Sequence, residues 1–440
     1  MNKTLVLSAG FAALVSQIGQ AQSMPPVRQL GPVTSVAKDP LGAVTTVRQL
    51  PDGRVLVNDI VGRRVVMFDS TLSSVTVVAD TTSATTNAYG TRPGGLISYH
   101  GDSTLFIDPA SLSMLLIDPA GKIVRVMSAP RAEDVGFLVG GPFGNPGFDP
   151  QGRLIYRAPP RFNFNGPPPS RNGIPQIPTP PDSAAIVRFD LATRKLDTVT
   201  WFKTPKITLN VTKSPDGGIR VLPVVNPLPQ ADDWAILQNG TVAIVRGRDY
   251  HVDLVGAQGT TSLPKIPFEW ERLTDEGKVA YLDSAKIAIE KMRASGQFFG
   301  FGGVGGSGGA TVTRTVEAGP PGGPPRSDVT REGPVATTGG GAAATQLPPI
   351  TFVLPNELPD YRPAFTPGST RVDADGNLWV RTSHNVDARP VYDVINQKGE
   401  LIDRVQLPQN RSLAGFGPSG VVYLAVRDST TAHLEKARLK

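Results

Sequence analysis

The 440-residue chain contains no cysteine, and only four of its residues are histidine. The absence of cysteine excludes disulfide frameworks, thiolate zinc sites, iron–sulfur clusters and cysteine nucleophiles. No two histidines stand at the i, i+4 spacing with which a helix can hold a metal ion. Few residue types are therefore left that could carry redox or metal chemistry.

Long apolar runs and a strong charge of one sign are also missing. The 44 Lys and Arg exceed the 38 Asp and Glu by a net charge of only +6. A nucleic-acid binder would need a larger excess gathered on one face, so we expect no nucleic-acid partner. Beyond the N-terminal residues, no segment reaches the about 18 consecutive apolar residues that indicate a membrane-spanning helix.

The first residues are typical of a secretory signal peptide. Lys3 supplies a positive charge, the stretch 5–18 is mostly apolar, and 19–21 has the small-x-small cleavage pattern. The apolar stretch falls short of the about 20 residues that span a bilayer, which disfavours an uncleaved anchor. We therefore expect residues 1–21 to be removed and 22–440 to be exported to the periplasm or the external medium.

Glycine and proline are abundant, with 47 and 42 residues, which favours many turns over a helical bundle. One unit recurs: an apolar strand, a turn ending in Gly, a second apolar strand, a polar loop, and a strand ending near Phe-Asp or Ile-Asp. The first copy is 44–69, VTTVRQLPDGRVLVNDIVGRRVVMFD, whose apolar runs predict buried strands. A tight hairpin needs a residue at positive φ, which glycine supplies. The six turn glycines are Gly53, Gly101, Gly152, Gly240, Gly376 and Gly420.

The spacing of these glycines indicates the architecture. Three of the five intervals are close to the roughly 40–50 residues of a four-stranded propeller blade. One longer interval contains a Pro-rich loop at 159–183 and a predicted hairpin at 206–228, and the other contains an insertion at 270–360. The last unit lacks one strand. The segment 27–39 would supply it and close the ring, so that no sheet edge stays free.

The motifs that carry the repeat are PDGRVLVND, DPQGRLIYR, DADGNLWVR and GPSGVVYLAVRD. On these motifs the chain resembles the six-bladed β-propellers of bacterial exported proteins, in the broad NHL-like and TolB-like group. The resemblance implies an all-β fold built as a single six-bladed β-propeller. It implies little about activity, since one fold hosts many chemistries. A pair of β-sandwiches is the alternative, but it does not account for the recurring period.

The insertion between the fourth and fifth units departs from the repeat. Within 270–298, Thr274 is expected to cap a helix whose first turn carries Asp275 and Glu276, followed by apolar residues at helical spacing. The stretch 300–349 is so rich in glycine and proline that we expect it to be disordered. It matches the dinucleotide-binding and nucleophile-elbow patterns only by composition. We reject both matches, because the strand–turn–helix context of those motifs is missing.

Aligning the repeats places polar and charged residues at the far end of each second strand. The first two units carry Asn58, Asp59 and Asp108 there, and the other four carry arginine. A guanidinium offers a rigid fork of donors suited to carboxylate, phosphate or sulfate. We therefore predict an anion-binding mouth gated by the loops 159–183 and 381–390. Its expected ligand-binding residues are Arg157, Arg246, Arg381, Arg427 and His384.

Three other interpretations of this face stay open. Arg157 and Arg427 could instead pair with acidic residues of neighbouring units, which would make them structural. A metal-dependent hydrolase or lactonase of the gluconolactonase-like type would need oxygen ligands around a divalent ion such as calcium. The candidates for that site are Asp59, Asp108, Asn145 and Asp232. An aromatic cage for a glycan would draw on Trp201, Trp234, Trp270 and Trp379, in a chain with only 7% aromatic residues.

The residues favour a binding module over an enzyme. We expect a non-catalytic propeller without cofactor or catalytic residues. It would recognise a protein partner or a small anionic ligand at one propeller face, and we expect it to be a monomer. The alternative is the metal-dependent hydrolase.

Overall fold

The computed structural model describes residues 22–82, 88–160, 170–171, 174–175, 179–213, 219–294, 350–428 and 431–439. The predicted signal peptide 1–21, the stretch 300–349 and most of the loop 159–183 lie outside these residues. The regular secondary structure of the described chain is nearly all β-strand, as the sequence predicts, with one α-helix, α1 (Asp275–Ala294). No helix within these ranges is long and apolar enough to cross a membrane.

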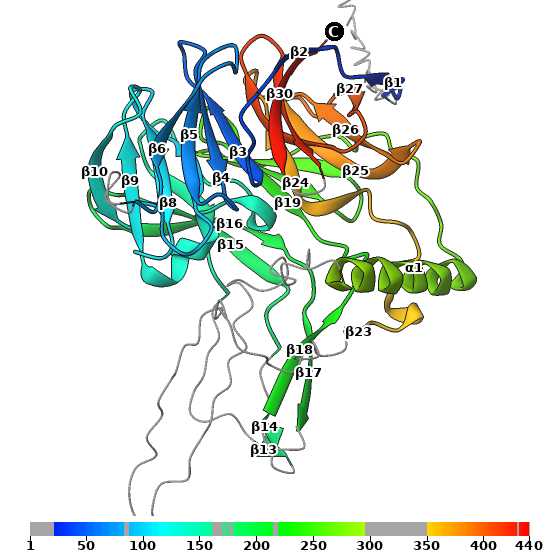
Figure 1. Cartoon of the computed structure of the whole chain (residues 1–440). Helices are drawn as coiled ribbons and strands as arrows, with labels where there is room; N and C mark the ends of the chain where they lie inside the picture. The colour runs from blue at the N-terminus through cyan, green and yellow to red at the C-terminus, as the bar shows by residue number, and fades with distance from the viewer. Residues whose placement is uncertain are drawn as a thin grey trace, which may run out of the picture.

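Six sheets with at least four strands form the body of the molecule, and we number them first to sixth in chain order (Figure 1). The first contains β3 (Val44–Gln49), β4 (Val55–Asp59), β5 (Arg64–Phe68) and β6 (Val75–Ala79), and the second β7 (Gly95–Ser98), β8 (Thr104–Asp108), β9 (Ser113–Ile117) and β10 (Ile123–Ser128). The third contains β11 (Gly147–Phe148), β12 (Leu154–Arg157), β15 (Ser183–Phe189) and β16 (Leu196–Lys203), and the fourth β19 (Asp233–Ile236), β20 (Val242–Arg246), β21 (His251–Gly256) and β22 (Gly259–Ser262). The fifth contains β24 (Phe365–Val372), β25 (Leu378–Val386), β26 (Arg389–Ile395) and β27 (Leu401–Gln406), and the sixth β28 (Arg411–Gly417), β29 (Val421–Arg427) and β30 (Ala432–Arg438).

The N-terminal segment completes the last two sheets. β2 (Val33–Val36) pairs antiparallel with β30 and is the fourth strand of the sixth sheet. β1 (Val27–Gln29) pairs parallel with β27 as a fifth strand of the fifth sheet. The segment 27–39, which the sequence assigns to the last unit alone, therefore contributes a strand to each of two sheets.

The first two strands of each sheet are joined by a turn that contains glycine at positive φ, and all six lie where the repeat predicts them. These are Gly53, Gly101, Gly152, Gly240, Gly376 and Gly420, with φ between 59° and 88°. The Phe-Asp pattern of the repeat also has a local cause. Asp69 follows β5 and accepts the backbone N–H groups of Thr71 and Ser73 at 2.9 and 3.0 Å. An Asp side chain at this place thus forms the turn into the fourth strand.

The second strand of the first sheet shows why these strands are apolar throughout. All five residues of β4 are buried. Val55 and Val57 belong to the core shared with the sixth sheet, whereas Leu56 between them belongs to the core shared with the second sheet. Because successive side chains of a strand point to opposite faces, one strand supplies two cores. Each such buried side chain contributes about 1.5–3 kcal/mol.

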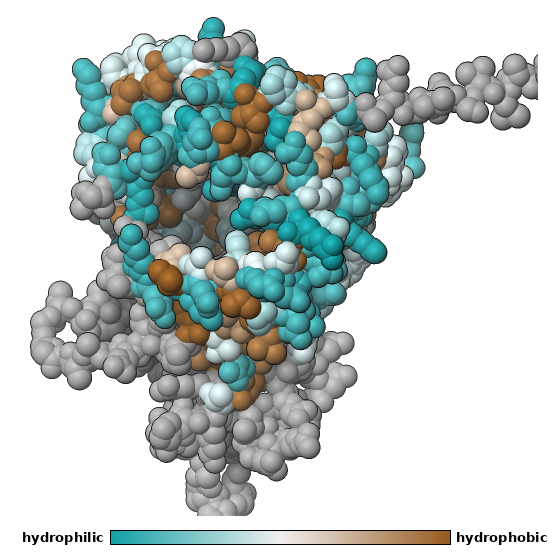
Figure 2. Space-filling view, turned by 90° about the vertical axis from the view of Figure 1, so that its right-hand side faces the viewer, coloured by the Kyte–Doolittle hydropathy of each residue, from teal (hydrophilic) through white to brown (hydrophobic). Residues whose placement is uncertain are grey.

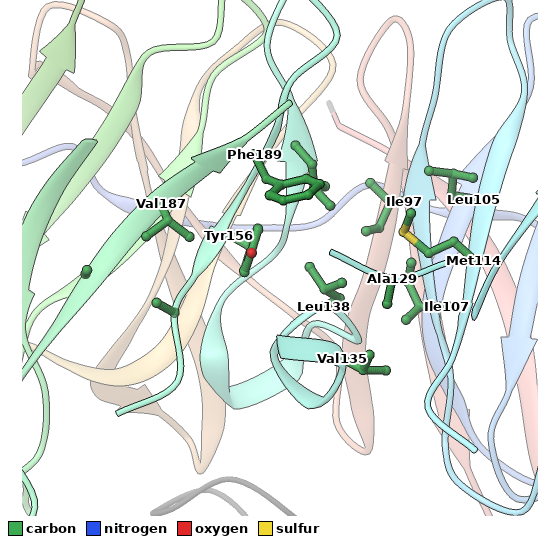
Figure 3. Close-up of a cluster of buried hydrophobic side chains, with 13 residues drawn as sticks. Ile97, Leu105, Ile107, Met114, Ala129, Val135, Leu138, Tyr156, Val187 and Phe189 are labelled. Atoms are coloured by element: carbon green, nitrogen blue, oxygen red, sulfur yellow. The ribbon is translucent and has the colours of Figure 1, made fainter. Parts of the chain in front are cut away.

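Six hydrophobic clusters lie between neighbouring sheets. One of them joins the sixth sheet to the first. Figure 3 shows the cluster between the second and third sheets. Leu105 and Met114 come from the second sheet and Tyr156 and Phe189 from the third, with Leu138 from the connecting segment. That connection contains the 3-10 helices η2 (Ala132–Phe137) and η3 (Gly141–Phe143). Each sheet is thus held by its two neighbours in a closed series.

A smaller part of the chain extends away from the six sheets (Figure 1). β17 (Thr208–Lys213) and β18 (Ile219–Val225) form the antiparallel hairpin predicted at 206–228. β23 (Thr351–Phe352) joins this hairpin by pairing parallel with β18. β13 (Ser170–Arg171) and β14 (Ile174–Pro175) form a separate two-stranded sheet.

Helix α1 lies within the segment 270–298 that the sequence predicts to be helical. The N–H of Gly277 donates to Oγ1 of Thr274 at 3.1 Å, so Thr274 caps the helix as expected. Leu282 and Ile289 are the buried apolar residues among positions 275–291 of the helix. Leu282 packs with Val353 and with Leu358, which follows the 3-10 helix η4 (Pro355–Glu357). Figure 2 views the side on which α1 lies in Figure 1, where a hollow is bordered by hydrophilic and hydrophobic residues.

Candidate functional site

A small pocket lies where the third, fourth and fifth sheets meet. Its walls come from the end of β12, the end of β16, the start of β19 and the middle of β24. Prolines of the connecting segments line much of the remainder. The pocket encloses about 60 Å³, which is room for only a few water-sized groups. A ligand could place an end group here, but not its whole body.

Arg157 is the charged centre of this pocket. Its guanidinium carbon lies 5.7 Å from the ring centre of Phe137, 5.3 Å from that of Phe143 and 5.7 Å from that of Phe202. Aromatic faces attract a cation at such distances. Burial lowers the pKa of Arg157 to about 10, with Asp233 acting in the opposite direction. The side chain therefore stays positively charged at neutral pH.

The Nε–H of Arg157 is buried and has no hydrogen-bond partner among the described residues. Arg157 also makes no ion pair within this part of the chain, so the pairing with a neighbouring acid that the sequence left open is not formed. A buried donor without an acceptor costs about 1–3 kcal/mol. Arg157 is thus an unsatisfied cation facing a small cavity.

A tight turn positions the aromatic wall. The indole Nε1–H of Trp234 donates to the backbone oxygen of Phe143 at 2.9 Å. Gly144 follows at φ 89°, and a Cβ there would lie 2.3 Å from Nε1 of Trp234. Only glycine permits both this backbone conformation and this close approach. Gly144 and Trp234 together place Phe143 beside Arg157.

Asp233 is the buried acid next to Arg157 in this region. Its carboxylate accepts the backbone N–H groups of Thr370 at 2.8 Å and Trp234 at 2.9 Å. Burial raises the pKa of Asp233, and these donors act in the opposite direction. The hydrogen bond to Thr370 joins the fourth sheet to the fifth. Asp233 therefore helps to hold together two of the sheets that line the pocket.

Arg246, the second predicted arginine, forms ion pairs instead of lining the pocket. Its NH1 lies 2.7 Å from Oδ2 of Asp232 and its Nε lies 2.7 Å from Oδ2 of Asp253. Both carboxylates are buried. Burial lowers the pKa of Arg246, but the two carboxylates outweigh it and raise the pKa overall. Arg246 therefore holds β20 to β21 and to the start of β19.

Arg381, Arg427 and His384 lie away from this pocket. Arg381 in β25 and Arg427 at the end of β29 are exposed. Nε2 of His384 lies 3.8 Å from Oε2 of Glu269, and its ring lies 6.1 Å from Phe268. Of the five residues predicted to form one anion-binding mouth, Arg157 lines the pocket and the other four do not.

The candidate metal ligands are occupied by the protein's own donors. Asp59 accepts the N–H groups of Gly42, Ala43 and Gly62 at 2.9–3.1 Å. Asp232 accepts those of Lys203 and Gly247 in addition to its ion pair.

Asp108 and Asn145 are engaged in the same way. Asp108 accepts the N–H of Ala110 and the hydroxyl of Ser111, and Asn145 donates to the oxygen of Thr370 at 3.3 Å. The described residues contain no group of three or more His, Asp or Glu able to hold a metal ion.

Three phenylalanines and Asp233 are pocket residues that the repeat alignment did not identify. The signal that could have found one of them is the segment Gly140-Gly141-Pro142-Phe143-Gly144, which stands just before the third unit. Three glycines around a single Pro-Phe pair are typical of a turn that presents a side chain at a defined place. Phe137 and Phe202 carry no such local signal.

Comparisons with known proteins give similarity of structure only. No protein-family model and no curated protein matches the chain. A gluconolactonase from Xanthomonas campestris is 11% identical with a TM-score of 0.38, covering 93% of this chain and 99% of its own. Regucalcin from Agrobacterium tumefaciens, a calcium-binding protein, is 12% identical with a TM-score of 0.37, covering 94% and 97%. Virginiamycin B lyase from Staphylococcus aureus is 8% identical with a TM-score of 0.36, covering 90% and 96%.

Identities this low assign no activity to the chain. Its fold class follows from its own topology. Sheets of four antiparallel strands succeed one another along the sequence, the fifth with β1 added in parallel. Each sheet packs face to face on its neighbours, and the N-terminal segment completes the last. The chain has the fold of a β-propeller.

Proposed function

We propose that the chain is an exported six-bladed β-propeller that binds an anionic ligand through Arg157. The ligand is a small carboxylate or a carboxylate presented by a protein partner, and the module is non-catalytic. Export is supported by the signal-like residues 1–21. The single observation that carries the binding function is the buried, unpartnered Nε–H of Arg157.

The six-bladed architecture is supported by the closed series of six inter-sheet clusters. In a propeller, the first strands of the blades surround a central axis and the last blade must pack against the first. Val57 of β4 and Tyr423 of β29 share one cluster, which joins the ends of the series. Pairing of β2 with β30 adds a second closure, made by backbone hydrogen bonds.

A carboxylate matches the pocket in size and in the geometry of the Arg157 donors. The two acidic residues that line the pocket are already engaged, Asp232 by Arg246 and Asp233 by backbone N–H groups. The guanidinium fork presents parallel donors that a carboxylate accepts with two oxygens. The three phenylalanine rings lower the local dielectric and exclude water, which strengthens an ion pair formed there. About 60 Å³ admits a carboxylate with few further atoms, so the rest of the ligand would lie outside. The ligand therefore enters by an anionic end.

The test is the thermal stability of the mature chain in increasing acetate, formate and phosphate, each at an ionic strength matched with sodium chloride. A ligand that binds only the folded state raises Tm with its concentration. Acetate and formate are expected to raise Tm more than chloride does. In Arg157→Met, which keeps an apolar stem but removes the cation, this increase should disappear.

Arg427→Met is the matched control, since Arg427 occupies the same repeat position but is exposed. It should keep the full response to acetate. An increase in Tm with acetate that is as large in Arg157→Met as in the natural chain would contradict the proposal. Equal loss of this increase in both variants would contradict it too. Circular dichroism of each variant without anion establishes that the sheets are intact.

A further inference from the structure

A second, wider groove lies on the molecule apart from the Arg157 pocket. It is lined by Gln230, Arg248, Trp270, Pro359, Asp360 and Tyr361 and has a volume of about 530 Å³. That is within the range of about 300–1,000 Å³ of pockets that hold small organic ligands. None of its residues belongs to the anion-binding mouth that the repeat alignment predicts.

Two aromatic side chains are exposed at this groove. Trp270 is 38% exposed and Tyr361 is 49% exposed. Trp and Tyr offer an apolar face together with a polar N–H or O–H group, so they suit ligands that are partly apolar and partly hydrated. Exposed aromatic residues gathered at a hollow usually mark a binding surface.

The backbone beneath the aromatic rings is held on both sides. The N–H of Leu273 donates to the oxygen of Asp360 at 2.8 Å, and the N–H of Arg362 donates to the oxygen of Glu271 at 2.9 Å. Tyr361 lies between these two bonds. The ring of Trp270 packs against that of Phe268 edge to face, with ring centres 5.2 Å apart. The backbone at Tyr361 and the ring of Trp270 therefore need little ordering when a ligand binds, which lowers the entropic cost of binding.

Helix α1 fixes the acidic group of the groove. The Nζ of Lys278 donates to Oδ1 of Asp360 at 2.7 Å, and the Lys278 side chain is only 6% exposed. This bond, with the charge of Lys278, lowers the pKa of Asp360. Oδ2 of Asp360 has no hydrogen bond within the described chain and stays free to accept one. The insertion thus supplies a fixed acceptor to the edge of the aromatic surface.

The polar side chains around the rings include both hydrogen-bond donors and hydrogen-bond acceptors. Arg248 can only donate hydrogen bonds, ionised Asp360 can only accept them, and Gln230 can do both. Saccharide hydroxyls both donate and accept, and the C–H face of a pyranose ring is apolar enough to stack on Trp or Tyr. A proline-rich peptide offers carbonyl acceptors and almost no donors, so it would give Oδ2 of Asp360 no hydrogen bond.

We propose that this groove binds a saccharide, stacked on Trp270 and Tyr361 and hydrogen-bonded by Arg248, Asp360 and Gln230. The site is independent of the anion pocket, because no residue lines both. Its volume suits one or two sugar rings with the chain continuing into solvent. The molecule would then combine a glycan-binding surface with a separate site for an anionic end group.

The experiment titrates the mature chain with cellotetraose, maltotetraose and chitotetraose and follows intrinsic tryptophan fluorescence and heat of binding. Trp234 and Trp379 are buried, so a spectral change on stacking reports the exposed indoles. At least one tetrasaccharide is expected to bind with a millimolar or lower dissociation constant. Trp270→Ala should weaken that binding at least about tenfold, which is about 1.4 kcal/mol.

Trp201→Ala is the matched control, because Trp201 is exposed on β16 and does not line the groove. It should leave the dissociation constant unchanged. Arg248→Ala changes an exposed side chain and tests its polar contact without threatening the fold. Asp360→Asn also removes the charge partner of Lys278, whose side chain is only 6% exposed, so circular dichroism must first show that this variant is folded. Each should weaken binding severalfold.

Three results would overturn the proposal. They are the absence of binding to every tetrasaccharide at 10 mM, equal weakening by Trp201→Ala and Trp270→Ala, and binding of a decaproline peptide in place of the saccharides.

Discussion

Tyr250 donates its phenolic hydrogen to Oδ2 of Asp393 at 2.9 Å, across the boundary between the fourth and fifth sheets. Both residues are buried, and Oδ1 of Asp393 has no hydrogen-bond partner among the described residues. Nε of Arg404 lies 3.4 Å from that oxygen. Burial raises the pKa of Asp393 to about 6, although Tyr250 and Arg404 act in the opposite direction. Ionisation of this carboxyl group at the interface between the two sheets therefore costs more free energy in the folded protein than in the unfolded chain.

The consequence is a pH dependence of stability between about pH 4 and pH 7. The folded protein binds this proton more tightly than the unfolded chain, in which an Asp has a pKa near 3.9. The contribution of Asp393 to the free energy of unfolding is complete below that value and is lost as the pH rises through about 6. The full loss is on the order of 2–3 kcal/mol.

Asp393→Asn isolates this effect, because Asn can still accept the hydrogen of Tyr250 but does not ionise. Urea unfolding at a series of pH values should show the variant gaining stability over the natural chain as pH increases from 4 to 7.5. A difference between the two proteins that is the same at every pH would contradict this assignment.

Removal of Arg246 is expected to destabilise the fold through the two carboxylates with which it pairs. Arg246→Met leaves Asp232 and Asp253, each 8% exposed, as buried carboxylates without their cation. The free energy of unfolding should fall by about 2–4 kcal/mol, measured by urea unfolding at pH 7.

Two further variants show whether this loss arises from the uncompensated carboxylates. Adding Asp253→Asn to Arg246→Met should recover part of the stability. Arg427→Met, at the exposed equivalent position, should change it by no more than about 0.5 kcal/mol. Equal losses in the Arg246 and Arg427 single variants would contradict the ion-pair role.

Gly144 and Gly141 provide a matched pair within one turn. Both have positive φ, 89° and 76°, so alanine at either position costs about 1–3 kcal/mol of backbone strain. A Cβ at Gly144 would overlap the indole of Trp234, whereas a Cβ at Gly141 meets nothing within 4 Å. Gly144→Ala should therefore be the less stable variant by a further 1–3 kcal/mol or so in urea unfolding. Equal losses of stability in the two variants would contradict this expectation, because Trp234 would then move away from the added methyl group without cost.

A chelator is expected to leave the thermal stability unchanged. The oxygens of Asp59, Asp108 and Asp232 already accept hydrogen bonds from backbone N–H groups, hydroxyls or Arg246. An ion would have to replace these donors, and one that bound the folded state would raise Tm with its concentration. Scanning calorimetry with EDTA and with added calcium checks this expectation. A stoichiometric metal whose removal lowers Tm would make the metal-dependent hydrolase the leading function.

The parts of the fold that could be predicted from the sequence are those with a local cause. Gly53 and Gly376 are required where a hairpin needs positive φ, whatever packs around them. Thr274 caps α1 because its hydroxyl accepts an N–H three residues later. The hairpin at 206–228 follows from two β-rich runs that flank the sequence Pro-Asp-Gly-Gly, a pattern that predicts a turn. Each of these interactions lies within a short stretch of chain.

The candidate sites depend on residues that are far apart in the sequence. Arg157 lies beside Phe137 and Phe202, which come from different parts of the chain, and Trp270 and Tyr361 line one groove from the two ends of the insertion. Arg157 and Arg246 occupy the same place in the repeat, yet only Arg246 has two carboxylates within reach. The repeat alignment treats them alike because it contains no information on what the adjacent sheet presents.

The sequence by itself determined the all-β class, the positions of the six turns and the helix start, because backbone conformation there depends on neighbouring residues. Only the tertiary structure decided which arginine is left without an acceptor and which aromatic rings stay exposed. Those properties depend on burial and on partners from other sheets, and they exist only once the sheets have packed against one another.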